Sequence, residues 1–217
     1  MKNKSDLAKE GKKFITELKE RYGITVKVIR CDNSDKNKTY ERELAGGNIM
    51  FEYTASLTPQ QNGVVERRFA KLYNRIRAIM HSAGIDKSTK QKIWTECAHI
   101  ATLMDNLLFY DNGKNVNDRL KNNQPKFTKN MRKFGEIGIA LNHSLKNIRS
   151  KVDDKGIACI FVGYSLKHGE GVCRMYNLKT NRIFISRGIM WLNQTYGQYK
   201  NKRIKLKQHP LLQKQME

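Results

Sequence analysis

The chain has 217 residues, and its 39% hydrophobic content is enough for one large domain or two small ones. Lys and Arg number 42 against 20 Asp and Glu, and the resulting net charge of +22 predicts an extended polyanion as partner. The sequence contains no run of about eighteen apolar residues and no signal-peptide block near its start, so we expect an intracellular protein with no membrane contact. Four scattered cysteines without a C-x-x-C pair argue against a zinc ribbon and a disulfide framework, and we expect reduced, mostly buried thiols.

The first fifty residues contain both helical and strand periodicity. Apolar residues at helical spacing predict a helix that begins after Ser5 and ends before Gly23. Alternating apolar residues then predict a strand over residues 24–32, which ends on a carboxylate. Residues 33–47 are polar and contain a Gly pair, which favours a loop or a weak helix, and residues 49–53 are typical of a second short strand.

The most regular segment follows the loop TPQQNG (residues 58–63). Measured from Glu66 at 100° per residue, its apolar side chains occupy roughly 220° to 340° of the helical wheel; they are Val65, Phe69, Leu72, Tyr73, Ile76, Ile79 and Met80. The opposite arc carries the basic side chains Arg67, Arg68, Lys71, Arg75 and Arg77. These could form a solvated helix face, but the net charge favours a surface that binds nucleic acid.

The second half begins with a helix near residues 89–109 and continues with strands. Residues 119–133 hold six Lys or Arg and no acid, which predicts a basic linker over 111–133. Beyond the linker we expect a small antiparallel barrel or sandwich with strands at 137–141, 157–164, 172–178 and 183–192. The end, residues 196–217, is predicted to be a basic flexible tail. Trp94 and Trp191 lie within apolar patterns and are predicted to be core residues.

Two carboxylates are candidate metal ligands. Asp32 stands at a strand end, and Glu66 lies in the first turn of the helix after the TPQQNG loop. A pair of divalent cations about 4 Å apart needs several rigid oxygen ligands and can then activate a nucleophile for phosphodiester chemistry. Acids are also common at strand ends and in first helical turns, so the pattern alone leaves a structural role open.

Three motifs resemble the integrase region of copia-type long-terminal-repeat retrotransposons. They are CDN (31–33), LTPQQNGVVERR (57–68), and CIFVGYS (159–165) followed by RMYNLKTNRIFISRGIMWLN (174–193). The resemblance implies an α/β fold: a partial ribonuclease-H-like catalytic core without its first strands over 1–110, the linker, and a β-rich domain over 134–195. It also implies DNA integration with Mg²⁺ or Mn²⁺, with element ends and target DNA as partners.

Carried over to this chain, the resemblance assigns the catalytic and metal-binding roles to Asp32 and Glu66. The resemblance places Asn62 in the loop before the helix. Together with the net charge it favours Asn62, Arg67, Arg68, Lys71, Arg75 and Arg77 as nucleic-acid contacts. The first acid of the family's Asp, Asp, Glu triad has no counterpart, because only 31 residues precede Asp32 and their acids belong to a surface helix. Asp35 is a weaker alternative ligand because its spacing to Glu66 fits the family less well.

Two hypotheses follow. The first is that the chain is a fragment of an integrase, related by descent to DNA integration but inactive as an isolated chain. The alternative is a non-catalytic basic DNA-binding protein. The segment KNKRIKLK (200–207) is similar to a nuclear import sequence and is equally compatible with nonspecific DNA binding, so we expect a nuclear protein and keep both roles open. A homo-oligomer remains one of the partners to be considered.

Overall fold

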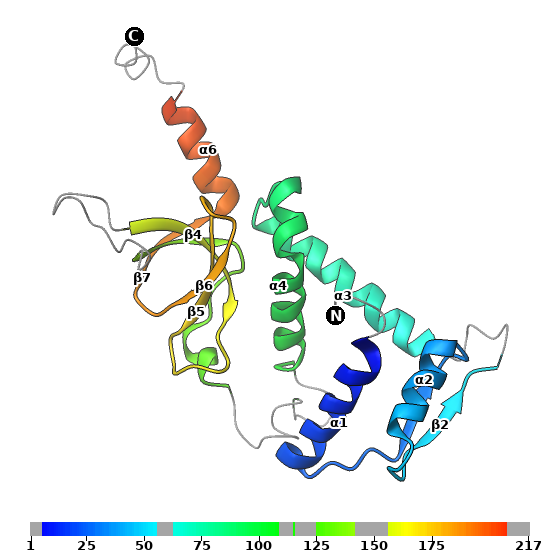
Figure 1. Cartoon of the computed structure of the whole chain (residues 1–217). Helices are drawn as coiled ribbons and strands as arrows, with labels where there is room; N and C mark the ends of the chain where they lie inside the picture. Colours follow the sequence, from blue (N-terminus) through cyan, green and yellow to red (C-terminus); the bar gives the residue numbers. More distant parts are fainter. Residues whose placement is uncertain (1–5, 56–62, 109–114, 116–124, 142–155, 208–217) are drawn as a thin grey trace. The chain divides into compact units, whose positions relative to one another are not determined.

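The computed structural model describes residues 6–55, 63–108, 115, 125–141 and 156–207 (Figure 1). The chain divides into two compact units, residues 1–71 and residues 72–217, and the division falls inside one helix. Both helical and strand elements are present, as expected for an α/β chain. Among the described residues, no helix is long and apolar enough to cross a membrane.

The first unit begins with α1 (Leu7–Tyr22), which ends where the sequence predicted. Gly23 adopts the left-handed conformation at φ 65°, and its N–H donates to the Lys19 carbonyl at 3.0 Å. This glycine satisfies a terminal carbonyl of the helix in a conformation that other residues adopt only at a cost. The helix starts after Asp6, and the predicted cap Ser5 lies outside the described residues.

A β-α-β segment completes the first unit. It consists of β1 (Val28–Cys31), α2 (Asp35–Leu44) and β2 (Met50–Tyr53), and the two strands pair in parallel with Val28 opposite Met50. The segment left open between loop and weak helix therefore forms a helix. Tyr40 of α2 packs against Gly11 of α1, where a Cβ would collide with the tyrosine ring.

The second unit contains most of α3 (Gly63–Ser82), α4 (Lys87–Asp105) and a five-stranded antiparallel sheet. The strands are β3 (Glu136–Leu141), β4 (Gly156–Tyr164), β5 (Cys173–Asn177), β6 (Ile183–Ser186) and β7 (Ile189–Thr195), in the order β6-β5-β4-β3-β7. The single strand predicted over 183–192 is thus two strands. They are separated at Arg187 and Gly188 and lie at opposite edges of the strongly curved sheet (Figure 1).

The helices and the sheet of this unit share one hydrophobic core. Ile76 of α3, Ile93 and Cys97 of α4, and Phe161 of β4 all belong to it, and Glu96 forms a bidentate ion pair with Arg174 of β5 at 2.7 and 2.8 Å. The predicted division into a core (1–110) and a β-rich domain (134–195) therefore does not coincide with the two units. Packing, which periodicity does not reveal, joins α4 to the sheet.

Part of the predicted linker also packs on the sheet. The 3₁₀ helix η3 (Lys126–Asn130) places Phe127 on the Tyr164 ring, with the ring centroids 4.5 Å apart. The backbone N–H of Arg132 donates to the Tyr164 hydroxyl at 2.7 Å, and the Arg132 guanidinium lies over the Trp191 ring. Residues 126–132 are therefore held by the β domain, while most of 111–124 lies outside the described residues.

The predicted flexible tail begins instead with a helix, α6 (Tyr196–Lys207). Thr195 and Gln198 form a reciprocal cap, because Gln198 accepts from the Thr195 N–H at 2.9 Å and the Thr195 hydroxyl accepts from the Gln198 N–H at 3.4 Å. The Tyr196 hydroxyl donates to Asp86 at 2.5 Å, and Lys200 donates to the same carboxylate at 3.0 Å. Asp86 also caps α4 by accepting from the Thr89 N–H, so one carboxylate joins both helix starts.

Candidate nucleic-acid interface

Asp32 follows β1 directly, as the sequence predicted, and its carboxylate is exposed. The carboxylate accepts from the Asn37 side-chain amide at 2.6 Å and from the Ser34 N–H at 3.3 Å. Asn37 also donates to the Asp32 carbonyl at 3.1 Å, so the carboxylate is bound to the first turn of α2. This geometry is that of a local Asx turn just before the helix. Asp35, the alternative ligand, is exposed on α2, 3.9 Å from Lys38.

Glu66 lies in the first turn of α3 and is exposed. Within the described ranges, no hydrogen bond joins it to Asp32, and no group of three His, Cys, Asp or Glu side chains could hold a metal ion. A two-metal site needs several such ligands. The described residues therefore do not supply a donor set that fits two magnesium or manganese ions.

The five predicted basic contacts of α3 differ in what they touch. Arg75 forms an ion pair with Asp105 of α4, and Arg77 donates to Asn74 at 2.8 Å. Arg67 donates to the Gly63 carbonyl at 3.1 Å, which leaves its positive charge unpaired. Arg68 and Lys71 are exposed, and in the described part of the chain neither has an acidic partner. Asn62 lies outside the described residues.

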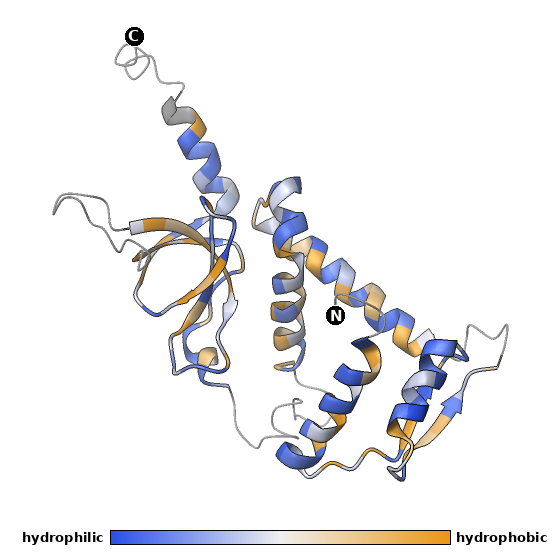
Figure 2. Ribbon diagram, viewed as in Figure 1, coloured by the Kyte–Doolittle hydropathy of each residue, from blue (hydrophilic) through white to orange (hydrophobic). Residues whose placement is uncertain are grey.

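The apolar face predicted for α3 is buried only in its second half. Ile76 and Met80 belong to the core of the second unit, whereas Val65, Phe69 and Tyr73 keep between 47% and 55% of their surface exposed. The alternation of apolar and hydrophilic residues along this helix can be followed in Figure 2. The apolar face of α3 is therefore about half exposed at these positions of its first half.

The two tryptophans also differ from each other. Trp191, predicted as a core residue, packs edge-on against Phe161 with centroids 5.8 Å apart and is partly buried against the core. Trp94 is 44% exposed on α4, so its predicted burial was wrong. Ile93 and Cys97 supply the buried face of that helix, and Trp94 lies next to that face rather than on it.

None of the four cysteines is disulfide-bonded, and three of them are buried, as predicted. Burial raises the pKa of Cys97 to about 12 and the pKa of Cys159 and Cys173 to about 11. Burial also raises the pKa of the half-buried Cys31. Since the thiolate is the reactive form, these thiols have no feature of a nucleophilic site.

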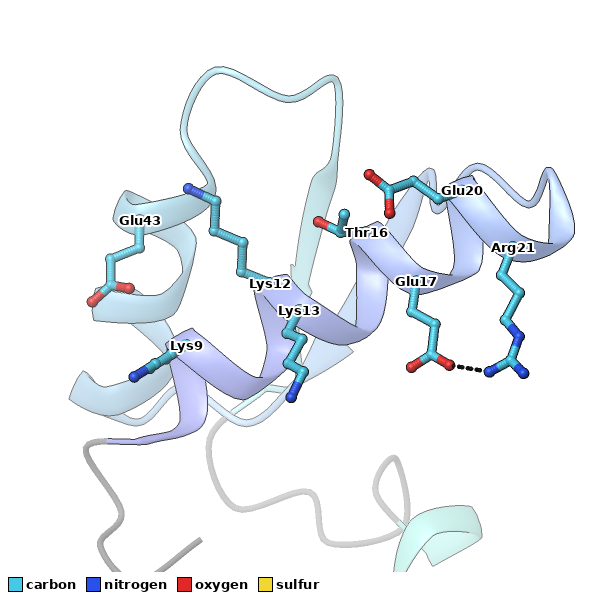
Figure 3. A pocket seen from close by; sticks show the side chains of 8 residues that line it. All are labelled: Lys9, Lys12, Lys13, Thr16, Glu17, Glu20, Arg21 and Glu43. Atoms are coloured by element: carbon cyan, nitrogen blue, oxygen red, sulfur yellow. Dashed lines mark hydrogen bonds and ion pairs between the residues drawn. The ribbon is translucent and has the colours of Figure 1, made fainter. Parts of the chain in front are cut away.

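A hollow of about 690 Å³ lies along α1 (Figure 3). Its lining side chains are Lys9, Lys12, Lys13, Thr16, Glu17, Glu20, Arg21 and Glu43. The Glu17–Arg21 pair, at 2.9 Å, is exposed, and the three lysines point in different directions from the helix. Mixed charges on an open surface do not define a ligand, so we assign no site there.

Sequence reasoning predicted the basic character of this segment but missed the helix α6 and the aromatic side chains on its surface. Tyr196, Tyr199, Lys200 and Arg203 follow one face of this helix at spacings of three and four residues. The capping sequence Thr195-x-x-Gln198 could have predicted the helix, because a threonine followed three residues later by glutamine is typical of a helix start. Together, these elements define a small module in which a curved antiparallel sheet is followed by a basic helix.

Comparisons with known proteins identify that module. Residues 139–204, which run from β3 into α6, match the model of the retroviral polymerase SH3-like domain. The chain is also 28% identical over 172 residues to the Retrovirus-related Pol polyprotein from transposon TNT 1-94 of Nicotiana tabacum. That similarity covers 76% of this chain and 12% of the polyprotein, so the chain spans a small part of its relative's length. Together the two findings confirm the resemblance to a region of a copia-type retrotransposon polyprotein.

Proposed function

We propose that this chain is the DNA-binding part of a retrotransposon integrase region and that it binds duplex DNA mainly through its phosphates. The observation that carries the proposal is the exposed pair Arg68 and Lys71 on α3, which has no acidic partner among the described residues. Unpaired cations of this kind release counterions from DNA when they contact phosphates, and this release drives binding without regard to sequence. The net charge of +22 supports the same partner.

The contacts sort four of the five basic residues of α3 into two groups. Arg75 is held by Asp105, and freeing it for a phosphate would break that ion pair. Arg68, Lys71 and Arg67 can meet a phosphate without losing an acidic partner within the described ranges. The proposed interface therefore centres on the first half of α3, next to the segment TPQQNG that carries the resemblance.

The experiment is a salt titration of duplex binding by fluorescence anisotropy. We expect the logarithm of affinity to fall steeply with the logarithm of salt for the unaltered chain. The double variant Arg68→Gln/Lys71→Gln should flatten the slope by about two units, at about 0.9 for each phosphate that the variant no longer neutralises. The matched control Lys167→Gln/Lys179→Gln removes the same charge from exposed positions on loops of the β domain and should change the slope by less than one unit. Equal effects of the two double variants would refute the interface on α3.

We also propose that the isolated chain does not process or join DNA ends. Asp32 is bound to the first turn of α2, and the two predicted acids lack a third, so we propose no metal-dependent step for this chain alone. An end-joining assay with Mg²⁺ or Mn²⁺ should give no product. Product that forms with this chain and is lost in Glu66→Gln would favour the catalytic hypothesis over the non-catalytic alternative.

A further inference from the structure

A second surface with the chemistry of a nucleic-acid site lies on α6, far along the chain from Arg68. A hollow of about 330 Å³ is lined by Leu178 of the turn between β5 and β6 and by α6 residues. The α6 residues are Tyr196, Tyr199, Lys200, Arg203 and Ile204. Pockets of about 300 Å³ or more are large enough for small planar ligands.

The lining combines flat apolar surface with positive charge and contains no acid. Tyr199 is half-buried, and the Arg203 guanidinium lies 5.8 Å from the centre of its ring. Arg203 is exposed and has no acidic partner in the described residues, so it can meet a phosphate. Leu178 and Ile204 add aliphatic walls, and Ile204 is 44% exposed.

The position of this hollow is fixed by contacts within the second unit. The Tyr196 hydroxyl and the Lys200 ammonium both donate to Asp86, and Lys200 lies 5.8 Å from the centre of the Tyr196 ring. The Gly197 N–H donates to the Ala83 carbonyl at 3.0 Å, and the Tyr196 N–H donates to the Gly135 carbonyl at 2.8 Å. The first turn of α6 is thereby attached to the sheet and to the α3–α4 turn, which preorganises the surface.

We propose that this hollow binds an unpaired nucleotide of a DNA strand, with the base against Tyr199 and the adjoining phosphate on Arg203. Proteins that bind single strands use this pairing of aromatic platforms with cations, because every base has a face that can stack. A base within an intact duplex has no free face, so the hollow selects unpaired DNA. The inference rests on the proposed DNA binding and adds to it a second surface and a second form of DNA.

The test compares a labelled twelve-nucleotide thymidine strand with a duplex of the same length by anisotropy. Tyr199→Leu should weaken single-strand binding about fivefold or more and change duplex binding by less than about twofold. Arg203→Gln should weaken single-strand binding more than its matched control Lys202→Gln, which removes the same charge from a neighbouring α6 position that does not line the hollow. Far-UV circular dichroism and thermal melts check that each variant is folded.

A strand containing 5-bromodeoxyuridine provides a direct readout, because we expect photo-crosslinking to place the adduct on Tyr199 or its neighbours in the hollow. Equal loss of single-strand and duplex binding in Tyr199→Leu would overturn the inference, as would no loss in either. Poly-glutamate is a competitor that tests for an acidic peptide as the ligand. An acidic peptide would be indicated instead if poly-glutamate displaces the strand from the unaltered chain and from Tyr199→Leu but not from Arg203→Gln. Duplex binding without single-strand binding would refute this inference alone, whereas absence of all DNA binding would refute the proposed function as well.

Discussion

The two compact units differ in how much apolar surface they bury. In the first unit, the buried apolar side chains of the described residues are Ala8 and Tyr40, while Val28 and Met50 of its parallel strands remain 46% and 63% exposed. The described residues of the second unit bury twenty side chains in one cluster. Parallel strands are normally covered on both faces, and a two-stranded sheet is marginal by itself. We therefore expect the second unit to carry most of the stability of the chain.

The largest effect should come from the centre of the second core. Phe161→Ala removes a fully buried ring and should lower the free energy of unfolding of that unit by about 3–5 kcal/mol. Trp94 and Trp191, the two tryptophans of the chain, both lie in the second unit, so a denaturant titration followed by tryptophan fluorescence reports on this unit alone. Tyr40→Ala should leave that transition unchanged and alter only the helical signal. A shift of the tryptophan transition by Tyr40→Ala would mean that the two units unfold together.

The next effect should come from the glycine contact that attaches α6. Gly84 has φ +66°, and a Cβ on it would lie 2.7 Å from the Gly197 Cα. Gly84→Ala should therefore combine backbone strain with a clash and cost about 3 kcal/mol. Gly171→Ala is the matched control, because Gly171 has φ +79° with open space around it, and it should cost about 1 kcal/mol. Similar losses, measured by thermal melts followed by tryptophan fluorescence, would show that strain alone matters at Gly84.

A smaller, pH-dependent effect should come from Asp86. Burial opposes ionisation of this carboxylate, but hydrogen bonds from Tyr196, Thr89 and Lys200 outweigh it and hold the pKa of Asp86 well below its usual range. A group with a depressed pKa contributes stability that is present above its unfolded pKa, about 3.9, and is lost as pH falls below that value. Asp86→Asn should cost about 1–2 kcal/mol at neutral pH and reduce the loss of stability in acid. Denaturant titrations at pH 7 and pH 3 measure the free energy of unfolding of the unaltered chain and of Asp86→Asn. An equal loss between pH 7 and pH 3 in the two proteins would contradict this role.

The smallest effect on stability should come from substituting Arg75 or Arg68, two arginines on the same helix. Arg75→Gln breaks the partly exposed ion pair with Asp105 and should cost up to about 1 kcal/mol in the second unit. Arg68→Gln should cost less than about 0.5 kcal/mol, because it removes no ion pair within the described ranges and glutamine is nearly as good a helix former. For duplex binding we expect the reverse order, with the larger loss in Arg68→Gln. The same order in both measurements would mean that Arg75 contributes to the interface.

Prediction from the sequence succeeded where the determining pattern is local. The end of α1 at Gly23, the position of Asp32 after β1 and the helix that starts beside Glu66 each depend on residues within a few positions of one another. The SH3-like strands were also found within a few residues of their ends, apart from the break at Gly188. The roles of Asp32 and Glu66 in catalysis and metal binding remain predictions.

The sequence by itself determined most of the elements and the excess of positive charge, because spacing and composition are properties of the chain alone. Only the tertiary structure decided which half of α3 is buried, that Arg75 is paired while Arg68 is not, and that α6 is anchored at Asp86. Each of these depends on a partner distant in the sequence: Asp105 is thirty residues from Arg75, and Tyr196 is 110 residues from Asp86. Helical periodicity shows that a face is apolar or charged, but how much that face contributes to the stability of the fold depends on which residues the fold packs against it.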